Sequence, residues 1–375
     1  MRVIRGLHNL KAAHRGCVAT IGNFDGVHRG HQAILQQCRE HAARWKVPLT
    51  VVVFEPQPRE FFAGDQAPPR LTRLREKVRL LRDFGTEQVL VLPFNDALRS
   101  LTGSEFIDQV LIDGLNVKHL VVGDDFRFGC DRRGDFALLA EVGREQGFGV
   151  EHTRTFTVDD ERVSSSRVRT LLASGNFSAA ARLLGRPYLL HGRVVRDQQL
   201  GRTIGVPTAN LPQLPQPLTL RGVFAVIAEL ENGKRYPAVA NVGFRPTVGS
   251  TRPTLEVHLL DFKGDLYGQR MTVFPCVRLR GEVKFDGLDA LKAQIERDQA
   301  RARQYFAAAS VGQASTSHDS TNQASTNQAS TSHDSADQDA AEHSDSLPLA
   351  SAPLGRETTS SDSSSAGNPA DANDG

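Results

Sequence analysis

The sequence lacks any long apolar run: nothing in its 375 residues approaches the ~18–20 consecutive apolar residues that a membrane-spanning helix needs. Its start, MRVIRGLHNLKAAHRG, has no apolar core of a secretory signal peptide. The four cysteines, Cys17, Cys38, Cys130 and Cys276, lie far apart without a Cys-x-x-Cys pair, which argues against a disulfide framework and a zinc site. These absences predict a cytoplasmic protein with reduced thiols and no membrane association.

Net charge is also small, because 45 Lys and Arg residues stand against 43 Asp and Glu residues, for a total of +2. Residues 1–310 contain 44 basic and 33 acidic residues (+11), whereas residues 311–375 contain one basic residue, Arg356, and ten acidic ones (−9). A positive body attracts phosphate-bearing ligands. Nucleic acid is the alternative partner, but the basic residues are dispersed without an aromatic and basic platform, so we expect no nucleic-acid binding.

The last part of the chain has a biased composition. No aromatic residue follows Phe306, and the octapeptide QASTSHDS at 313–320 recurs at 328–335. Such a stretch buries too little apolar surface to offset its ordering entropy, which predicts a disordered tail over 308–375. A solubilising acidic extension is the favoured interpretation, and a partner-binding segment is the alternative.

The body exceeds one typical hydrophobic core, which predicts two domains. In its first part, up to residue 185, short apolar runs alternate with helix-length segments. The runs cover 17–21, 49–54, 88–92 and 119–122, and the helical segments include 30–44, 71–84, 166–173 and 178–184. Uninterrupted apolar strands separated by helices predict an α/β domain with a parallel sheet covered on both faces.

In the second part, over 186–307, strand-like segments follow one another without helices. They cover 192–196, 223–230, 236–242, 255–260 and 271–279, with turn signals such as Asn-Gly between them. This pattern predicts an antiparallel sheet or small β-barrel. A closing helix over 286–306 is expected to pack against it through one stripe: Leu288, Leu291, Ile295, Ala302 and Phe306.

The sharpest local pattern is ATIGNFDGVHRGHQAIL, residues 19–35. An apolar strand ends there and a helix begins, so His28 and His31 fall on one face of the first helical turn. A helix N-terminus offers N–H groups and a positive dipole end, and Gly22 and Gly26 allow close backbone approach to a ligand. Histidines that only cap the joint are the alternative; the combination favours a phosphate site.

Two later segments are expected near the same edge of the sheet, because ligands of open parallel sheets bind beyond the carboxyl ends of the strands. In GDDFRFGCDRRGD, residues 123–135, Phe126 and Phe128 can stack on a planar ring, and the arginines can meet phosphate. In VSSSRVR, residues 163–169, three serines form an N-cap cluster, and arginine in the following turn opposes the helix dipole. A bound anion would reconcile the two.

In this order, TIGNFDGVHRGHQ, FEPQPREFF (54–62), GDDFRFG and VSSSRVR resemble the FMN adenylyltransferase module of the bacterial bifunctional riboflavin kinase/FAD synthetase family. The resemblance implies a Rossmann-like nucleotidylyltransferase fold and transfer of AMP from ATP to FMN, with release of pyrophosphate. The sequence departs from the family at Gln57, often His, at Ser166, usually Thr, and at Asp131, often Gly.

Such a reaction needs positioning and charge neutralisation rather than a protein nucleophile, because a phosphate oxygen of FMN attacks the α-phosphorus of ATP directly. The resemblance implies that His28, His31 and Arg169 are catalytic and that Phe62 and Phe128 contact the flavin. The ATP-binding residues that it implies are Gly22, Asn23, Phe24, Asp25, Asp125, Phe126, Ser164, Ser165 and Ser166.

The second part carries its own pattern. In GRTIGVPTANL, residues 201–211, Thr208 and Asn210 would face one side of an extended segment, and their oxygens suit Mg²⁺; an ordinary turn is the alternative. Glu256 and His258 would share one face of a strand. A polar outer face is the usual explanation, and a base for a hydroxyl proton near a cation is the other.

With NVGFRPTVG (241–249), expected as a loop, and GVFAV (222–226), these segments resemble the riboflavin kinase module of the same family. The resemblance implies phosphorylation of the riboflavin 5′-hydroxyl by Mg·ATP, with Glu256 as general base and Thr208 and Asn210 as metal ligands. Further contacts to ATP or flavin are implied for Gly201, Gly205, Pro207, Thr208, Asn210 and Arg245.

The expected ligands are therefore riboflavin, FMN, FAD and ATP, with Mg²⁺ as the metal ion. A chain in which one module alone is active is the alternative within the enzyme class, and a homo-oligomer is left open.

Overall fold

The computed structural model describes residues 1–123, 125–153, 155–196, 205–212, 218–247 and 250–319. Residues 1–318 form one compact unit. The expected disordered tail begins inside helix α10 (Leu288–Asp319), which continues past residue 307. The rest of that tail lies outside the described residues, and its disorder stays a prediction. In the part of the chain that the structure describes, no helix has the length and apolar content that crossing a membrane requires.

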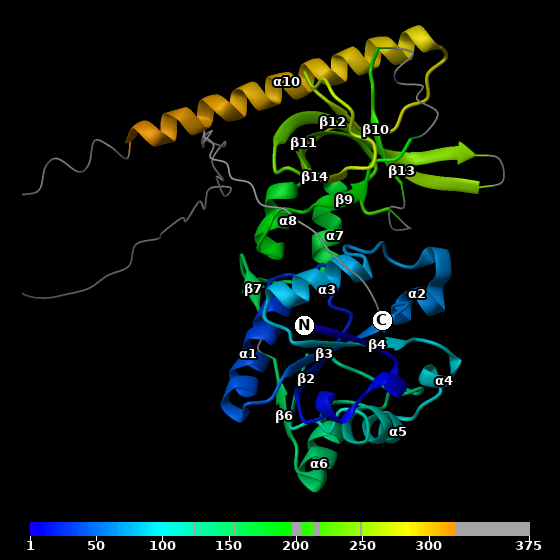
Figure 1. Cartoon of the computed structure of the whole chain (residues 1–375), viewed down its shortest axis with the longest axis vertical. Coiled ribbons are helices and arrows are strands. Elements are labelled where there is room, and N and C mark those ends of the chain that lie inside the picture. The colour runs from blue at the N-terminus through cyan, green and yellow to red at the C-terminus, as the bar shows by residue number, and fades with distance from the viewer. Residues whose placement is uncertain (124, 154, 197–204, 213–217, 248–249, 320–375) are drawn as a thin grey trace, which may run out of the picture. The chain divides into compact units, whose positions relative to one another are not determined.

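The first half is built on a six-stranded parallel sheet with the order β1-β4-β3-β2-β5-β6 (Figure 1). Its strands are β1 (Arg2–Arg5), β2 (Val18–Ile21), β3 (Leu49–Glu55), β4 (Gln88–Pro93), β5 (His119–Val122) and β6 (Gly149–His152). Its larger helices are α1 (Arg29–Trp45), α3 (Leu74–Asp83), α6 (Phe136–Gln146), α7 (Ser165–Ser174) and α8 (Phe177–Leu184). Shorter elements are α2 (Pro58–Ala63), α4 (Asp96–Arg99), α5 (Gly103–Phe106) and the hairpin β7 (Thr157–Val158) and β8 (Glu161–Arg162).

Both faces of this sheet are covered, as expected. Val51 and Val53 of β3 belong to a hydrophobic cluster with Leu35 of α1, whereas Val52 between them belongs to a second cluster with Leu139 of α6. Successive side chains of a strand point to opposite faces, so a strand buried on both sides must be apolar throughout. The continuous apolar runs of the sequence follow from this burial.

The second half is an antiparallel sheet with the order β10-β13-β12-β11-β14-β9 (Figure 1). A backbone hydrogen bond of 2.9 Å from Val195, just after β9, to Asn210 of β10 joins the two edge strands and closes the barrel. Its strands are β9 (Leu190–Arg193), β10 (Ala209–Leu211), β11 (Gly222–Leu230), β12 (Arg235–Thr247), β13 (Ser250–Leu259) and β14 (Arg270–Arg280).

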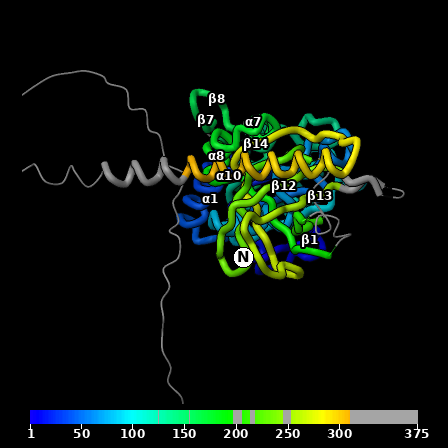
Figure 2. The backbone as a smooth tube through the Cα atoms, turned by 90° about the horizontal axis from the view of Figure 1, so that it is seen from above, coloured from blue at the N-terminus to red at the C-terminus, as the bar shows by residue number. Residues whose placement is uncertain are grey.

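Helix α10 lies across the barrel, seen from above in Figure 2. Ala302 is fully buried against Val223, Ala225 and Leu279, and Phe306 packs on the same cluster. Leu288, expected on the packing stripe, is 54% exposed, because it is the first residue of the helix. The fold class expected from the sequence, a parallel α/β half followed by an antiparallel barrel with a closing helix, is confirmed.

Two features differ from the sequence interpretation. The segment 241–249, expected as a loop, extends strand β12 as far as Thr247, which pairs with Ser250 of β13. Strands β1 and β6 were not expected, because these edge strands are short, and β6 is half-exposed and lacks a continuous apolar run. Prolines and glycines in 241–249 suggest a loop, whereas the long neighbouring strand supplies the pairing that keeps residues 241–247 extended.

Candidate functional site

Four parallel strands of the first sheet end along one edge, at Ile21, Glu55, Pro93 and Val122. Because the strands are parallel, the loops that follow them must lie at this same edge. The segment of His28, the segment of Phe62 and the loop after Val122 are three of those loops, so the sheet gathers three of the four expected motifs.

His28 and His31 lie together at the start of α1. The Nδ1 atom of His28 caps the helix by accepting a hydrogen bond from the backbone N–H of His31 (3.4 Å), and the two rings stack with centroids 3.7 Å apart. An accepting Nδ1 leaves the ring proton on Nε2, as a donor. The Nδ1 atom of His31 is buried and has no hydrogen-bond partner among the described residues.

Burial sets the protonation state of this pair. Desolvation lowers the pKa of His28 to about 4, and it lowers the pKa of His31, to which His28 adds in the same direction. Both imidazoles are therefore neutral at pH 7. Two neutral rings can donate hydrogen bonds to phosphate oxygens without adding positive charge to the buried site.

The loop before these histidines is held in an unusual backbone conformation. Phe24 and Val27 have positive φ angles of 46° and 41°, which non-glycine residues rarely adopt. Arg186 donates to the carbonyls of Gly26 (2.6 Å) and Val27 (3.2 Å) and so fixes the loop. Phe24 is 1% exposed, and its ring lies 4.8 Å from the His31 ring, which it supports. The sequence had suggested that Phe24 faces a ligand, but in this structure it is buried.

Asp25 is also buried, and it organises the site. Its carboxylate accepts hydrogen bonds from the backbone N–H groups of Leu71 and Thr72 and pairs with Arg169 at 2.6 Å. Arg169 also donates from Nε to the carbonyl of Pro69 (2.6 Å). Asp25 was expected to bind ATP, whereas its contacts orient Arg169 and the start of α3.

The three serines at the start of α7 also differ in their contacts. Ser164 caps α7 by accepting from the N–H of Arg167 (3.2 Å), as expected from the sequence. Ser165 donates its hydroxyl proton to the carbonyl of Asp25 (2.9 Å) and so joins α7 to the histidine loop. Ser166 is exposed. Gly22 and Asn23, at the end of β2, are half-buried.

The aromatic residues expected at the site differ in exposure. Phe62 is 66% exposed and meets Phe61 and Phe94 edge to face, at 5.4 and 5.7 Å, which makes an open apolar surface after β3 and β4. Phe128 is 8% exposed and packs in the core, with Phe126 stacked on it at 5.4 Å. Of the two residues expected to contact the flavin, Phe62 alone therefore offers an exposed ring.

Asp125 lies in the loop after β5. Its side chain is 76% exposed and pairs with Arg162 of β8 at 3.2 Å. Such an exposed pair contributes little to stability and opens at little cost, so Asp125 remains available to a ligand.

Lys77 of α3 lies near this site, although the sequence motifs do not include it. It is 0% exposed, and its Nζ atom has no hydrogen-bond partner among the described residues. Burial lowers its pKa, while the nearby charge of Asp25 acts in the opposite direction and that of Arg70 adds to the lowering. The available signal was a lysine four residues before the buried Leu81, on the apolar face of the predicted helix.

In the barrel, pairing register brings the polar residues together. Asn210 of β10 lies directly opposite Glu256 of β13, which lies opposite Asn241 of β12. Their strand neighbours, such as Leu255 and Val257, belong to the hydrophobic core, so the polar row faces the other side of the sheet. The Oδ1 atom of Asn210 is buried and has no hydrogen-bond partner among the described residues.

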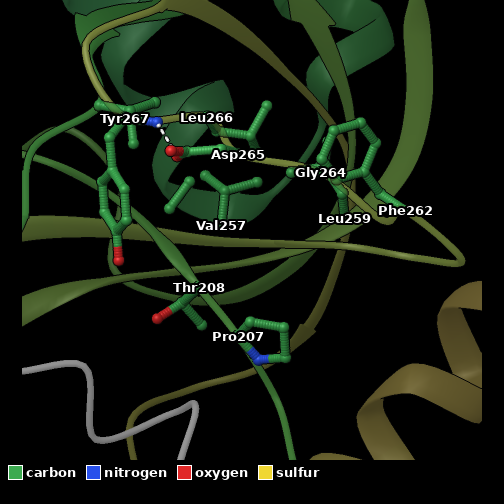
Figure 3. A pocket seen from close by; sticks show the side chains of 11 residues that line it. Pro207, Thr208, Val257, Leu259, Phe262, Gly264, Asp265, Leu266 and Tyr267 are labelled. Carbon is green, nitrogen blue, oxygen red and sulfur yellow. Dashed lines mark hydrogen bonds between the residues drawn. The ribbon is translucent and has the colours of Figure 1, made fainter.

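Thr208 and Pro207 lie at a nearby pocket, which Figure 3 shows from close by. Leu259, Phe262 and Tyr267 also line it. Thr208 lies just before β10, which begins at Ala209. Strand geometry therefore does not hold Thr208 on the same face as Asn210, as had been expected. His258, on the same face of β13 as Glu256, has its Nδ1 atom 2.8 Å from the carbonyl oxygen of Pro207 and fixes this segment.

The remaining expected kinase residues are only partly described. Gly205 is exposed, with a positive φ of 78°. Gly201 lies outside the described residues. Arg245 belongs to β12, where it pairs with Arg252, but its side chain also lies outside what the structure describes.

Comparison with known proteins gives two family matches, one in each part of the chain. A family model described as FAD synthetase matches residues 10–167, and one described as riboflavin kinase matches residues 184–306. A bifunctional riboflavin kinase/FMN adenylyltransferase of Pseudomonas fluorescens is 52% identical over 311 residues, which cover 83% of this chain and 99% of that protein. The chain belongs to this bifunctional family.

The family named from the motifs is thus confirmed, and with it the enzyme class. The Escherichia coli (strain K12) relative of the same name is 50% identical over 307 residues, covering 82% of this chain and 98% of that protein. A solved Streptococcus pneumoniae structure, titled a macrolide-efflux protein, has a TM-score of 0.66 and 30% identity, covering 80% of this chain and 98% of that one. Its title names a different role, whereas both curated relatives are named as enzymes.

Proposed function

We propose that the two halves of this chain divide the two reactions of the family between them. The barrel half phosphorylates riboflavin to FMN with ATP, and the parallel-sheet half transfers AMP from ATP to FMN, giving FAD and pyrophosphate. Residues 1–185 and 186–307 are the corresponding modules. The ligands are riboflavin, FMN, FAD and ATP, and the reactions take place in the cytoplasm.

In the adenylyltransferase half, the protein supplies position and charge. The neutral rings of His28 and His31 donate to phosphate oxygens of ATP, and Arg169, oriented by Asp25, offsets the charge that grows as the α–β phosphoanhydride bond breaks. Asp125 and Phe126 contact the nucleoside. Phe62 stacks on the flavin, since its ring is largely exposed.

Lys77 adds a further positive group to this half. Its buried Nζ has no partner among the described residues, and Asp25 lies close enough to influence its pKa. A cation buried at such a cost is best explained by an anionic ligand that pairs with it in the complex.

In the kinase half, the chain's own residues hold the hydroxyl and the phosphates. Glu256 accepts the proton of the riboflavin 5′-hydroxyl. The hydroxyl oxygen forms the bond to the γ-phosphorus of ATP, with ADP as the leaving group. His258 positions the Pro207–Thr208 segment through its contact with the Pro207 carbonyl. The neighbouring polar row places an amide beside the proposed base.

The donor atoms of this half fit a magnesium ion. The Oδ1 atom of Asn210, buried and without a hydrogen-bond partner among the described residues, is a hard oxygen ligand that lies in register with a carboxylate. The Thr208 hydroxyl is a second neutral oxygen two residues earlier. Asn210 and Thr208 would hold the ion together with ATP phosphates. When bound, Mg²⁺ neutralises phosphate charge during transfer.

The observation that carries the proposal is the separation of two polar sets: the His28–His31 stack beside the Asp25–Arg169 pair at the sheet edge, and Asn210 opposite Glu256 in the barrel. The test is to incubate the full chain with riboflavin, ATP and Mg²⁺ and to separate the flavins over time. FMN should form first and FAD should follow.

Two variants should each remove one reaction. His31→Ala should slow FAD formation about a hundredfold while FMN accumulates, because one buried donor is lost. Glu256→Gln should slow FMN formation by about a hundredfold or more and leave FAD synthesis from supplied FMN intact. His8→Ala and Glu229→Gln, away from both sites, are the matched controls. Equal loss of both reactions in either site variant would contradict the division.

A further inference from the structure

A second histidine cluster lies apart from both proposed sites. His41 of α1, His119 of β5 and Glu151 of β6 place one ligand atom each within 4.8 Å of one another. The Oε2 atom of Glu151 is 2.7 Å from His41 Nε2 and 3.4 Å from His119 Nε2, and the two rings stack with centroids 4.0 Å apart. The two imidazoles thus direct their Nε2 atoms at one carboxylate oxygen.

This cluster cannot take part in the adenylyltransferase chemistry. His41 follows His31 by ten residues, which is about 15 Å along an α-helix. His119 is the first residue of β5, whereas the site lies beyond the last residue of that strand. The side chains of His41 and His119 are 24% and 12% exposed, so the cluster opens to solvent on one side.

We propose that His41, His119 and Glu151 bind a zinc ion, with water as the fourth ligand. Two imidazole nitrogens and one carboxylate oxygen are a common zinc-ligand set, and the nitrogen donors disfavour magnesium or calcium. Tetrahedral zinc with bonds of about 2.0–2.2 Å holds its ligands about 3.3–3.5 Å apart. The observed Nε2–Oε2 distances of 2.7 and 3.4 Å lie close to this separation, and all three ligand atoms lie within 4.8 Å of one another.

Bound zinc would join three elements: the second half of α1, the start of β5 and the edge strand β6. Helix α1 carries His28 and His31 at its other end, so the ion would stabilise the element on which the adenylyltransferase site is built. The sequence argued against a zinc site only from its cysteines. Residues 41, 119 and 151 form no short-range pattern, so only the sheet could bring them together.

The single tryptophan of the chain, Trp45, reports on this position, because its ring lies 6.2 Å from that of His119. The experiment titrates the metal-free full chain with Co²⁺, which quenches nearby fluorescence, and then adds Zn²⁺, which does not. We expect saturable quenching with one Co²⁺ per chain, reversal by Zn²⁺, and a higher thermal midpoint in Zn²⁺ than in EDTA.

His41→Gln and Glu151→Gln should raise the Co²⁺ concentration at half-maximal quenching at least about tenfold, since loss of an outer-shell partner alone lowers metal affinity that much. His8→Gln, an exposed histidine elsewhere, should leave it unchanged. Circular dichroism and FAD formation check that each variant is folded. Absent quenching in the wild type, quenching that Zn²⁺ fails to reverse, or unchanged midpoints in both ligand variants would overturn the proposal, leaving a hydrogen-bonded His–Glu cluster.

Discussion

The two proposed sites are built by different means. In the parallel-sheet half, buried charged groups hold one another: Asp25 fixes Arg169 and two backbone N–H groups, and Arg186 fixes the strained loop. In the barrel half, strand register alone aligns Asn210 with Glu256. A site held by paired charges should lose stability and activity together, whereas a site held by backbone pairing can lose a side chain and stay folded.

The largest effect should come from Asp25→Ala. It leaves the largely buried Arg169 without its carboxylate and two N–H groups without an acceptor, so the free energy of unfolding should fall by about 3–5 kcal/mol. Denaturant unfolding measures it, and FAD formation should be lost as well. Asp96→Ala, which removes an exposed pair with Arg99, is the control and should change stability little. Similar losses of stability in both variants would contradict the view that buried paired charges hold this site.

The next effect depends on pH. The unfolded chain protonates His28 below pH 6.5, whereas the folded chain does so only near pH 4, so the unfolded state binds more protons between these values. Stability should therefore fall as the pH drops from 6.5 to 4, with His28 contributing up to about 3 kcal/mol. In His28→Gln the fall should be smaller by that amount. Parallel curves for the two proteins would count against a buried neutral imidazole.

A smaller effect of opposite sign is expected for Lys77→Met. Lys77 is buried, and its Nζ atom has no hydrogen-bond partner in the part of the chain that the structure describes. An apolar side chain of similar length should therefore raise the free energy of unfolding by about 1 kcal/mol. The rate of FAD formation should fall, because an anion-pairing group is lost. The exposed Lys284→Met is the control for both measurements. A less stable Lys77→Met protein would mean that Lys77 has a structural partner.

The smallest change in stability should follow Asn210→Ala. Its Oδ1 has no hydrogen-bond partner to lose among the described residues, and its backbone pairing is kept. The free energy of unfolding should therefore change by less than about 1 kcal/mol. FMN formation should nevertheless collapse, while FAD synthesis from FMN continues. A stability loss as large as that of Asp25→Ala would show that the barrel site is held by side chains after all.

Much of the fold could be predicted from the sequence, because burial imposes a pattern on it. The continuous apolar runs of β2 to β5 exist because the sheet is covered on both faces, and β5 was placed at His119–Val122 without error. The weak edge strands β1 and β6 carry no such pattern. The extension of β12 through 241–247 is decided by its partner strand, which a local reading of glycine and proline cannot include.

The residues of the site could be listed from the sequence, but which of them are exposed to ligands and which are buried could not. His28 and His31 were placed correctly because three residues span one helical turn. Phe24, Asp25 and Phe128 were expected to meet ligands, and the structure buries all three. Exposure depends on what packs from distant parts of the chain, as Leu71 and Thr72 do on Asp25.

The sequence by itself determined the two kinds of sheet, the order of the motifs and the family, since periodicity and short motifs are local properties of the chain. Only the tertiary structure decided that Lys77 is buried, that Asn210 faces Glu256, and that residues 41, 119 and 151 converge. Each of these depends on which strands become neighbours. That choice is made by the free energy of the whole packed core, which no short segment contains.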